Sequence, residues 1–231
     1  SMINCAVNPQ AARERVTAYE PVVKSKKVMV IGGGVAGCEA ARVLAIRGHK
    51  PEVFEKGAVL GGNLIPGGTP DFKEDDHALA KWYEVQLEKL GVPVHMNTEV
   101  KKEDVLGADY DAVIVATGSR PKVFSLGDDA HVYTAADVLN GEKDCGSTTV
   151  VIGGGLVGCE TARWLAQQGK NVTIVEALDK LMAVNGPLCH ANKDMLERLV
   201  PYNGINVLTG AKVTGFRDGL LDVQTADGEQ K

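Results

Sequence analysis

The sequence predicts an α/β protein built from two copies of one strand, turn, helix and strand unit. The segment VIGGGVAGCE at residues 30–39 returns as VIGGGLVGCE at residues 151–160. The offset is constant at 121 residues (153 − 32), and it also relates Gly48 to Gly169 and Glu55 to Glu176. In both copies an apolar run precedes the glycines, and an amphipathic stretch and a second apolar run follow. We therefore predict two tandem Rossmann-like βαβ dinucleotide-binding domains.

The glycines of each copy have separate roles. The first allows a tight turn, the second lets a pyrophosphate approach the backbone, and the third lets the helix lie close to the strand. The helix N-terminus then offers free N–H groups to the phosphates. The alternative is a glycine turn that holds no ligand. The predicted phosphate-binding residues are Gly32, Gly34, Val35, Ala36 and Gly37 in the first copy, and Gly153, Gly155, Leu156, Val157, Gly158 and Glu160 in the second.

An acid ends the second strand of each copy. Glu55 and Glu176 both follow the first glycine by 23 residues (55 − 32 and 176 − 153). A carboxylate at this place accepts hydrogen bonds from the ribose hydroxyls of adenosine, whereas the alternative is a solvated charge at a strand end. A 2′-phosphate beside Glu176 would be repelled, and residues 177–179 contain no arginine. We therefore predict NADH rather than NADPH at the second site.

The two sites differ in what surrounds them. The first copy adds a lysine and a glycine pair after its acid, which suit a long cofactor, and an Ala-Thr-Gly turn where a flavin domain closes over its dinucleotide. The second copy lacks both features, so we predict FAD at the first site and NADH at the second. The further FAD-binding residues predicted are Glu55, Lys56, Gly62, Asn63, Leu64, Ala116, Thr117 and Gly118.

The chain divides into three predicted parts: a connector at residues 1–23, an FAD domain at 24–143 and an NAD(H) domain at 144–231. Residues 110–118 include a continuous apolar run, which predicts a parallel strand buried on both faces. The chain stops at residues 227–231, which resemble a turn, and no further strand is predicted for the second sheet. We therefore expect the second domain to be incomplete.

Shorter patterns predict the remaining elements. Strands are expected at residues 28–31, 53–55 and 92–96, and around Val207 and Val213. A surface helix that carries Leu79, Tyr83 and Leu87 should end at Gly91, and a further helix should contain residues 195–199. Residues 134–137 form a capping box at the start of a short helix.

Composition excludes several classes of function. The net charge is −5 without a basic block, which argues against nucleic acid as a partner. No apolar run approaches the roughly 18 residues of a membrane-spanning helix. The five cysteines contain no CxxC pair, which favours a reducing, cytoplasmic setting. The five histidines lack metal-ligand spacing, and we find no catalytic dyad, since in hydride transfer the cofactors carry the reaction.

The paired motifs resemble those of the two-dinucleotide flavoproteins, and the first residues sharpen the resemblance. Residues 5–9, CAVNP, followed by Arg13-Glu14, are similar to the junction in the family of 2,4-dienoyl-CoA reductase, 2-enoate reductase and trimethylamine dehydrogenase. In that family an FMN-binding (β/α)₈ barrel and a 4Fe–4S cluster precede the FAD and NAD(P)H domains. The resemblance makes Cys5 the last cluster ligand in a longer parent, with the other ligands and the barrel outside this chain.

The resemblance implies a relay in which NADH reduces FAD, and the cluster passes electrons to FMN for reduction of an activated C=C bond. Disulfide reductases of this architecture carry two cysteines in the loop that corresponds to residues 61–70, which has none. Cys38 and Cys159 are therefore interpreted as packing residues. Two alternatives are a module that binds ADP without electron transfer, and an electron-input unit for another partner.

Overall fold

The computed structural model describes residues 5, 7–183, 189–226 and 228–230. The chain forms two compact units, Ser1–Arg120 and Pro121–Lys231. The sequence placed this boundary after residue 143 instead. Residues 121–143 join the second unit because Leu126 and Val138 pack in its hydrophobic clusters.

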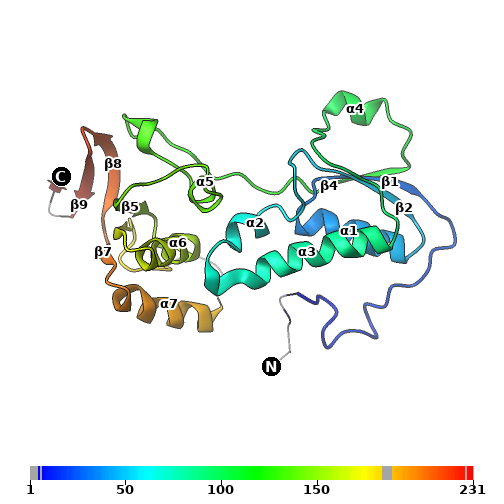
Figure 1. The fold of residues 1–231 in the computed structure, drawn as a ribbon, viewed down its shortest axis with the longest axis horizontal. Helices are drawn as coiled ribbons and strands as arrows, with labels where there is room; N and C mark the ends of the chain where they lie inside the picture. Colours follow the sequence, from blue (N-terminus) through cyan, green and yellow to red (C-terminus); the bar gives the residue numbers. More distant parts are fainter. Residues whose placement is uncertain (1–4, 6, 184–188, 227, 231) are drawn as a thin grey trace. The chain divides into compact units, whose positions relative to one another are not determined.

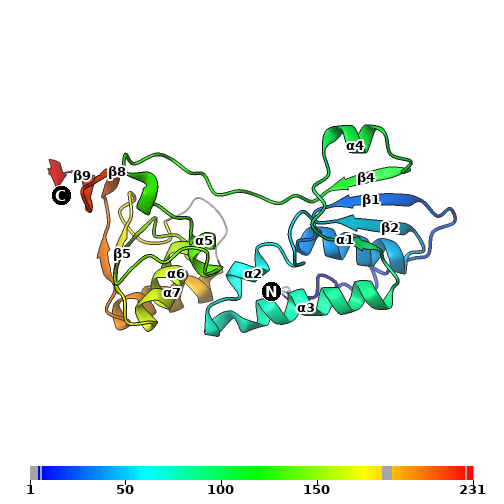
Figure 2. The ribbon, with the colours of Figure 1, turned by 45° about the horizontal axis from the view of Figure 1, so that its top comes forward.

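The first unit is a parallel four-stranded sheet with the order β3-β2-β1-β4. Helices α1 and α3 lie on one face of it (Figure 1, Figure 2). They bury Cys38, Tyr83 and Leu87 against Val30 and Val53 of the sheet. The elements are β1 Lys27–Ile31, α1 Val35–Ile46, β2 Lys50–Phe54, α2 Leu64–Gly67, η1 Asp71–Lys73, α3 Glu74–Lys89, β3 Val94–His95, α4 Lys102–Leu106 and β4 Ala112–Val115.

The strand, turn, helix and strand order predicted for the first copy is confirmed. Helix α1 ends before Gly48, whose φ of +90° a residue with a side chain rarely adopts. The following strand begins earlier than predicted, at Lys50, and β3 is confined to two residues of the predicted 92–96. Ile31 pairs with Phe54 and with Val115, so three carboxyl strand ends meet at the edge that carries the glycine turn.

The prediction that residues 110–118 form a strand buried on both faces is wrong. Among the described strands β4 pairs only with β1, which makes it the edge of the sheet. Val113 and Val115 are 38% and 71% exposed, because α1 and α3 cover only the opposite face. A continuous apolar run thus predicted the strand but not which of its faces is covered.

The second unit contains two sheets. A parallel sheet with the order β5-β6-β7 packs against α6 and α7 on one face, and an antiparallel sheet, β10-β9-β8, contacts the end of β6 through Val175. Ile174 of β6 faces the helices, whereas Val175 packs with Val213 and Val223 of the antiparallel sheet. The elements are η2 Asp129–His131, α5 Ala135–Leu139, β5 Thr148–Ile152, α6 Leu156–Gln167, β6 Asn171–Val175, α7 His190–Tyr202, β7 Asn206–Leu208, β8 Lys212–Arg217, β9 Leu220–Thr225 and β10 Gly228–Gln230.

Two local predictions for the second unit have opposite outcomes. The capping box is confirmed, since Thr134 and Asp137 exchange hydrogen bonds of 3.1 and 3.2 Å at the start of α5. The prediction of a turn at residues 227–231 is wrong for residues 228–230, which pair with β9 as strand β10. Residues 227 and 231 lie outside the described part of the chain. Among the described helices, none has the length and hydropathy needed to cross a membrane.

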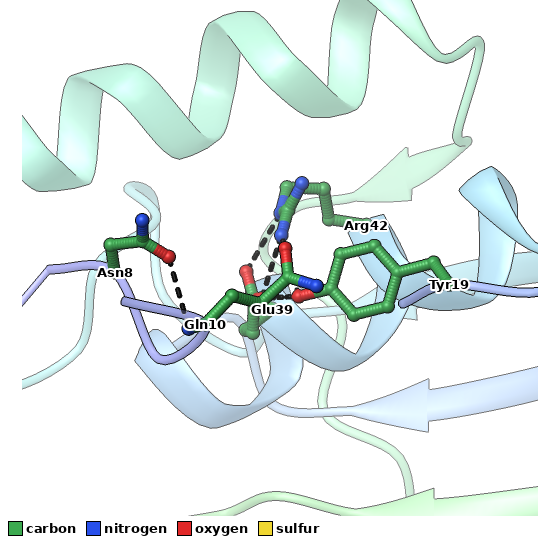
Figure 3. Close-up of polar contacts among 5 residues, drawn as sticks. All are labelled: Asn8, Gln10, Tyr19, Glu39 and Arg42. Carbon is green, nitrogen blue, oxygen red and sulfur yellow. Dashed lines mark hydrogen bonds and ion pairs between the residues drawn. The ribbon is translucent and has the colours of Figure 1, made fainter. Parts of the chain in front are cut away.

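The segment expected to be a connector is fastened to the first unit (Figure 3). Arg42 of α1 donates to both carboxylate oxygens of Glu39 at 2.8 Å, and also to the Tyr19 hydroxyl at 3.3 Å. Its guanidinium lies 5.5 Å from the ring centre of Tyr19 and 5.3 Å from that of Trp82. Arg42 therefore joins α1, α3 and the N-terminal segment.

Candidate dinucleotide-binding sites

The first and third glycines of each turn are required by the fold. Gly32 and Gly153 have φ values of +108° and +101°, which favour glycine. A Cβ at Gly37 would lie 1.8 Å from the Gly32 carbonyl oxygen, and one at Gly158 would lie 1.9 Å from that of Gly153. These four glycines let the turn close and the helix approach the strand, so they carry no evidence for a ligand.

The second glycine of each GxGxxG pattern, which is Gly34 in the first copy and Gly155 in the second, is different. Gly34 has φ −75° and ψ −175°, and Gly155 has φ −75° and ψ −174°, which any residue adopts. Among the described residues, a Cβ at Gly155 would meet no atom within 4 Å, and one at Gly34 would meet only the Gly62 Cα, at 3.8 Å. The protein itself gives no reason for glycine at either place. The space a Cβ would take lies at a helix N-terminus, where the pyrophosphate of a dinucleotide fits.

Both helix N-termini are prepared for an anion. The N-cap residues of α1 and α6 are Gly34 and Gly155, which have no side chain to cap the helix. Neither helix has an acidic residue in its first turn to offset the helix dipole. The predicted residues Val35, Ala36, Leu156 and Val157 form these first turns, so their backbone N–H groups are the donors available to a phosphate.

The two acids hold the turns in identical ways. Glu55 Oε2 accepts a hydrogen bond from Gly33 N at 2.6 Å, and Oε1 accepts one from Gly57 N at 2.6 Å. Glu176 repeats this arrangement with Gly154 N at 2.6 Å and Leu178 N at 2.8 Å. Each carboxylate oxygen has a second lone pair, and both side chains are half-buried. The acids can therefore fix the turn and still accept hydrogen bonds from a ribose.

Two loops flank the turn of the first site. Gly61 N donates to the Gly33 carbonyl at 2.8 Å, which brings Gly62 and the start of α2 at Asn63 and Leu64 next to the turn. On the other side, Ala116 N donates to the Ile31 carbonyl at 2.8 Å, which positions the exposed residues Thr117 and Gly118. The structure thus brings the predicted FAD residues together, except that Lys56 is exposed beside them without a contact that assigns it a role.

The second site contains a cavity of about 300 Å³. It includes the predicted residues Gly153 and Glu176. The sequence analysis missed the other lining residues, and four of them come from distant segments that carry no motif: Phe124, Ala211, Lys212 and Val213. Backbone hydrogen bonds from Ala211 N to the Glu176 carbonyl and from Gly210 N to the Leu178 carbonyl, at 3.0 and 2.7 Å, hold this segment beside the acid.

A larger hollow in the first unit, of about 390 Å³, includes none of the predicted cofactor residues. It runs along α3 and β3 and is lined by Ala58, Val59, Leu60, Glu84, Leu87, Glu88, Val92, Val94 and Met96. Size alone therefore does not identify the cofactor site of this unit, and the glycine geometry is the better guide.

Glu160, like Lys56, is a predicted residue for which the structure gives no cofactor role. It lies within α6 and corresponds to Glu39 of α1 by the same offset (160 − 39 = 121). In the first unit this position binds Arg42 and stabilises the protein. The role of Glu160 at the second site stays a prediction.

Cys38 and Cys159, at matching positions of the two copies, are buried packing residues. Cys38 and Cys159 are fully buried, and their Sγ atoms lie 3.2 and 3.4 Å from the carbonyl oxygens of Gly33 and Gly154. Burial, and then the charge of Glu55, raises the pKa of Cys38 to about 12. Burial and the charge of Glu176 raise the pKa of Cys159 to about 11. Both groups stay thiols at neutral pH, which supports the packing interpretation.

The described residues contain no group of three or more His, Cys, Asp or Glu side chains that could hold a metal ion. Cys5 is exposed. A cluster bound by Cys5 would therefore need its other ligands from elsewhere in the polypeptide.

The fold and the two turns define a protein of the class that binds two dinucleotides on tandem βαβ units. The pyridine nucleotide-disulphide oxidoreductase family matches residues 26–231, and the chain belongs to this family. It is 50% identical over 228 residues to cinnamate reductase of Clostridium sporogenes, which covers 99% of this chain and 34% of that protein. It is 38% identical over 219 residues to NADH oxidase of Thermoanaerobacter brockii, and this match covers 92% of this chain and 33% of that protein.

A solved structure gives the same result. The 2-naphthoyl-CoA reductase complex with 2-naphthoyl-CoA has a TM-score of 0.87 and 32% sequence identity over 99% of this chain and 35% of that one. These matches confirm the resemblance to the 2-enoate reductase and 2,4-dienoyl-CoA reductase family. The chain spans about a third of the length of these relatives.

Proposed function

We propose that the chain is the NADH-oxidising FAD module of an enoate-reductase-type flavoenzyme. FAD would bind the first unit and NADH the second. When bound, FAD supplies the redox chemistry by accepting the hydride of the reduced nicotinamide. In the full-length polypeptide the electrons would pass through a 4Fe–4S cluster to FMN on an N-terminal barrel, where an activated C=C bond is reduced. The names cinnamate reductase and NADH oxidase of two relatives support both ends of this route.

The observation that carries the proposal is the geometry of Gly34 and Gly155. Their backbone angles suit any residue, and the described neighbours leave room for a side chain. A turn needed only to let helix and strand touch would require the first and third glycines of the GxGxxG pattern but not the second. A ligand that approaches the backbone explains glycine at positions 34 and 155.

The residues of each unit then have defined tasks. The first turns of α1 and α6 donate backbone N–H groups to a diphosphate, and Glu55 and Glu176 accept hydrogen bonds from the ribose hydroxyls. Glu176 also favours NADH, since a 2′-phosphate would lie beside a carboxylate. Lys212 lines the same cavity, and among the described lining residues it is the cationic side chain that could attract a 2′-phosphate. We propose that the carboxylate, which ends the strand beside the turn, decides the preference.

The test uses the full-length protein loaded with FAD and freed of excess cofactor. Anaerobic addition of NADH should bleach the flavin absorbance near 450 nm, and NADPH should do so much more slowly. Protein that retains no FAD, or whose flavin NADH never reduces, would contradict the proposal. ADP binding without flavin retention would favour the nucleotide-binding alternative, and bleaching by NADH without reduction of an activated alkene would favour the electron-input alternative.

A further inference from the structure

One wall of the cavity in the second unit is a phenyl ring that no motif accounts for. Phe124 lines the cavity together with Gly153 and Glu176, and its side chain is 56% exposed. None of the aromatic contacts in the described part of the chain involves Phe124. A phenyl ring held at the surface beside a ligand cavity leaves apolar area that a bound molecule can cover.

The backbone next to Phe124 is fixed. Leu126, two residues further on, is buried among Val175, Ala211 and Val213. Its carbonyl accepts a hydrogen bond from Phe216 N at 2.6 Å, and Asp128 N donates to the Phe216 carbonyl at 3.0 Å. This pairing with β8 fastens the segment to the second unit. The backbone that follows Phe124 is thereby held beside the cavity, and Phe124 itself is more than half exposed.

The remaining lining has the composition that an adenosine needs. Ala177, Ala211 and Val213 are apolar, and Glu176 supplies hydrogen-bond acceptors at the same cavity. A purine base offers two apolar π-faces, and its ribose offers two hydroxyl groups. A carboxylate for the ribose beside an aromatic ring for the base matches this pair of requirements.

We infer that Phe124 is the platform on which the adenine of the second-site dinucleotide stacks. This inference rests on the proposed function, because it takes the second site to hold a pyridine dinucleotide. It goes beyond that proposal by naming the residue that positions the adenine. It also assigns a task to the segment before β5, in which the sequence showed no site.

The experiment compares Phe124→Ala and Phe124→Tyr with the wild type in the full-length protein. NADH binding is measured by anaerobic calorimetric titration of protein whose flavin has been reduced beforehand, so that no hydride is transferred, and binding of reduced nicotinamide mononucleotide, which has no adenine, is measured alongside. Phe124→Ala should weaken NADH binding roughly 5- to 150-fold, the range for loss of one aromatic stacking partner of a base. The Phe124→Tyr variant should bind NADH like the wild type, and the mononucleotide should bind all three proteins equally.

A matched control is Val123→Ala, since Val123 is the neighbouring residue, is 75% exposed and does not line the cavity. It should leave NADH binding unchanged. Equal NADH affinity in Phe124→Ala and wild type would overturn the inference while the proposed function stands. Weakening of the mononucleotide by the same factor would also overturn it, because the loss would then not come from the base. A wild-type protein that binds no NADH would contradict the proposed function itself.

Discussion

Glu176 Oε2 accepts a hydrogen bond from the backbone N–H of Gly154, with 2.6 Å between the two atoms. The same bond joins Glu55 to Gly33 in the first unit, also at 2.6 Å. The acid at the end of the second strand is thus a structural partner of the glycine turn before any nucleotide binds. A charged acceptor strengthens such a bond relative to a neutral one. Replacing either acid should therefore affect both the turn and the cofactor.

The first prediction concerns Glu176→Gln. The amide has one acceptor oxygen, so it cannot serve both Gly154 N–H and Leu178 N–H, and the free energy of unfolding should fall by about 1–2 kcal/mol. Removing the negative charge should also reduce the preference for NADH over NADPH by about tenfold or more. The kcat/KM values for flavin reduction by each nucleotide measure this change. The matched control is Glu55→Gln, which should weaken FAD retention and leave the nucleotide preference as it is.

Lys212 should determine how strongly Glu176→Gln shifts the nucleotide preference from NADH towards NADPH. In Glu176→Gln the ammonium group of Lys212 is left at the cavity without the nearby carboxylate, so it can attract a 2′-phosphate. The double variant Glu176→Gln/Lys212→Ala should lose most of the NADPH activity that the single variant gains. Equal kcat/KM for NADPH in the single and double variants would show that Lys212 does not reach the phosphate.

The elements that the sequence predicted well are those defined by local chemistry. Both strand–turn–helix units follow from glycines whose spacing and φ values the turn requires, and α5 follows from the Thr134–Asp137 capping box. The carboxylates of Glu55 and Glu176 were found in the same way, because the repeat fixes their distance from the turn.

The parts that the sequence did not predict depend on contacts between distant segments. Whether Val113 and Val115 are covered depends on which elements pack against β4, and an apolar run does not contain that information. Phe124 and Lys212 reach the second cavity from opposite ends of the second unit's sequence. Of the antiparallel sheet the sequence predicted only the strand around Val213, which is β8, and the sheet itself was missed for a related reason. Its short strands β8 and β9 mix polar and apolar residues, and Val175 of another sheet completes their core.

Another prediction concerns the buried thiols. Burial raises the pKa of Cys38 from its ordinary value near 9 to about 12, so the folded protein holds this proton more tightly than the unfolded chain. Below pH 9 both states are protonated and stability does not depend on this group. As the pH rises from 9 towards 12, the unfolded state ionises first, and the folded state loses about 1.4 kcal/mol per pH unit from this group.

Comparison of the wild type with Cys38→Ala isolates that contribution. The difference between their free energies of unfolding should be constant below pH 9 and should shift in favour of the variant above it. Alkylation supplies an independent measurement: at pH 8 iodoacetamide should label the exposed Cys5 and Cys189, and should not label Cys38 or Cys159 in the folded protein. Rapid labelling of Cys38 would contradict the raised pKa and the packing role.

The anchor of the N-terminal segment gives a further prediction. Arg42→Lys keeps the charge but loses the paired hydrogen bonds to Glu39 and the planar contact with Tyr19 and Trp82. Stability should fall by about 1–3 kcal/mol, and residues 8–20 should become sensitive to limited proteolysis. The control is Lys81→Ala, which removes an exposed ion pair with Glu84 and should leave the cleavage pattern unchanged.

The last prediction separates glycines that serve the fold from glycines that serve the ligand. Gly158→Ala places a Cβ 1.9 Å from the Gly153 carbonyl oxygen, and a contact that short forces α6 away from β5. This variant should lose several kcal/mol of stability or fail to fold. In Gly155→Ala the new Cβ meets none of the described atoms within 4 Å, and the backbone angles already suit alanine. Its stability should stay equal or rise by up to about 1 kcal/mol, because alanine restricts the unfolded chain.

Binding should show the reverse order of effects. The methyl group of Gly155→Ala occupies the space in front of the α6 N-terminus, so a diphosphate can no longer reach the backbone N–H groups. NADH affinity should fall by at least about tenfold in a protein whose thermal unfolding midpoint has not decreased. Gly34→Ala should produce the same pattern for FAD. A Gly155→Ala protein that binds NADH as tightly as the wild type would mean that the diphosphate does not lie against this turn, because a methyl group at that contact cannot be accommodated without displacing the ligand.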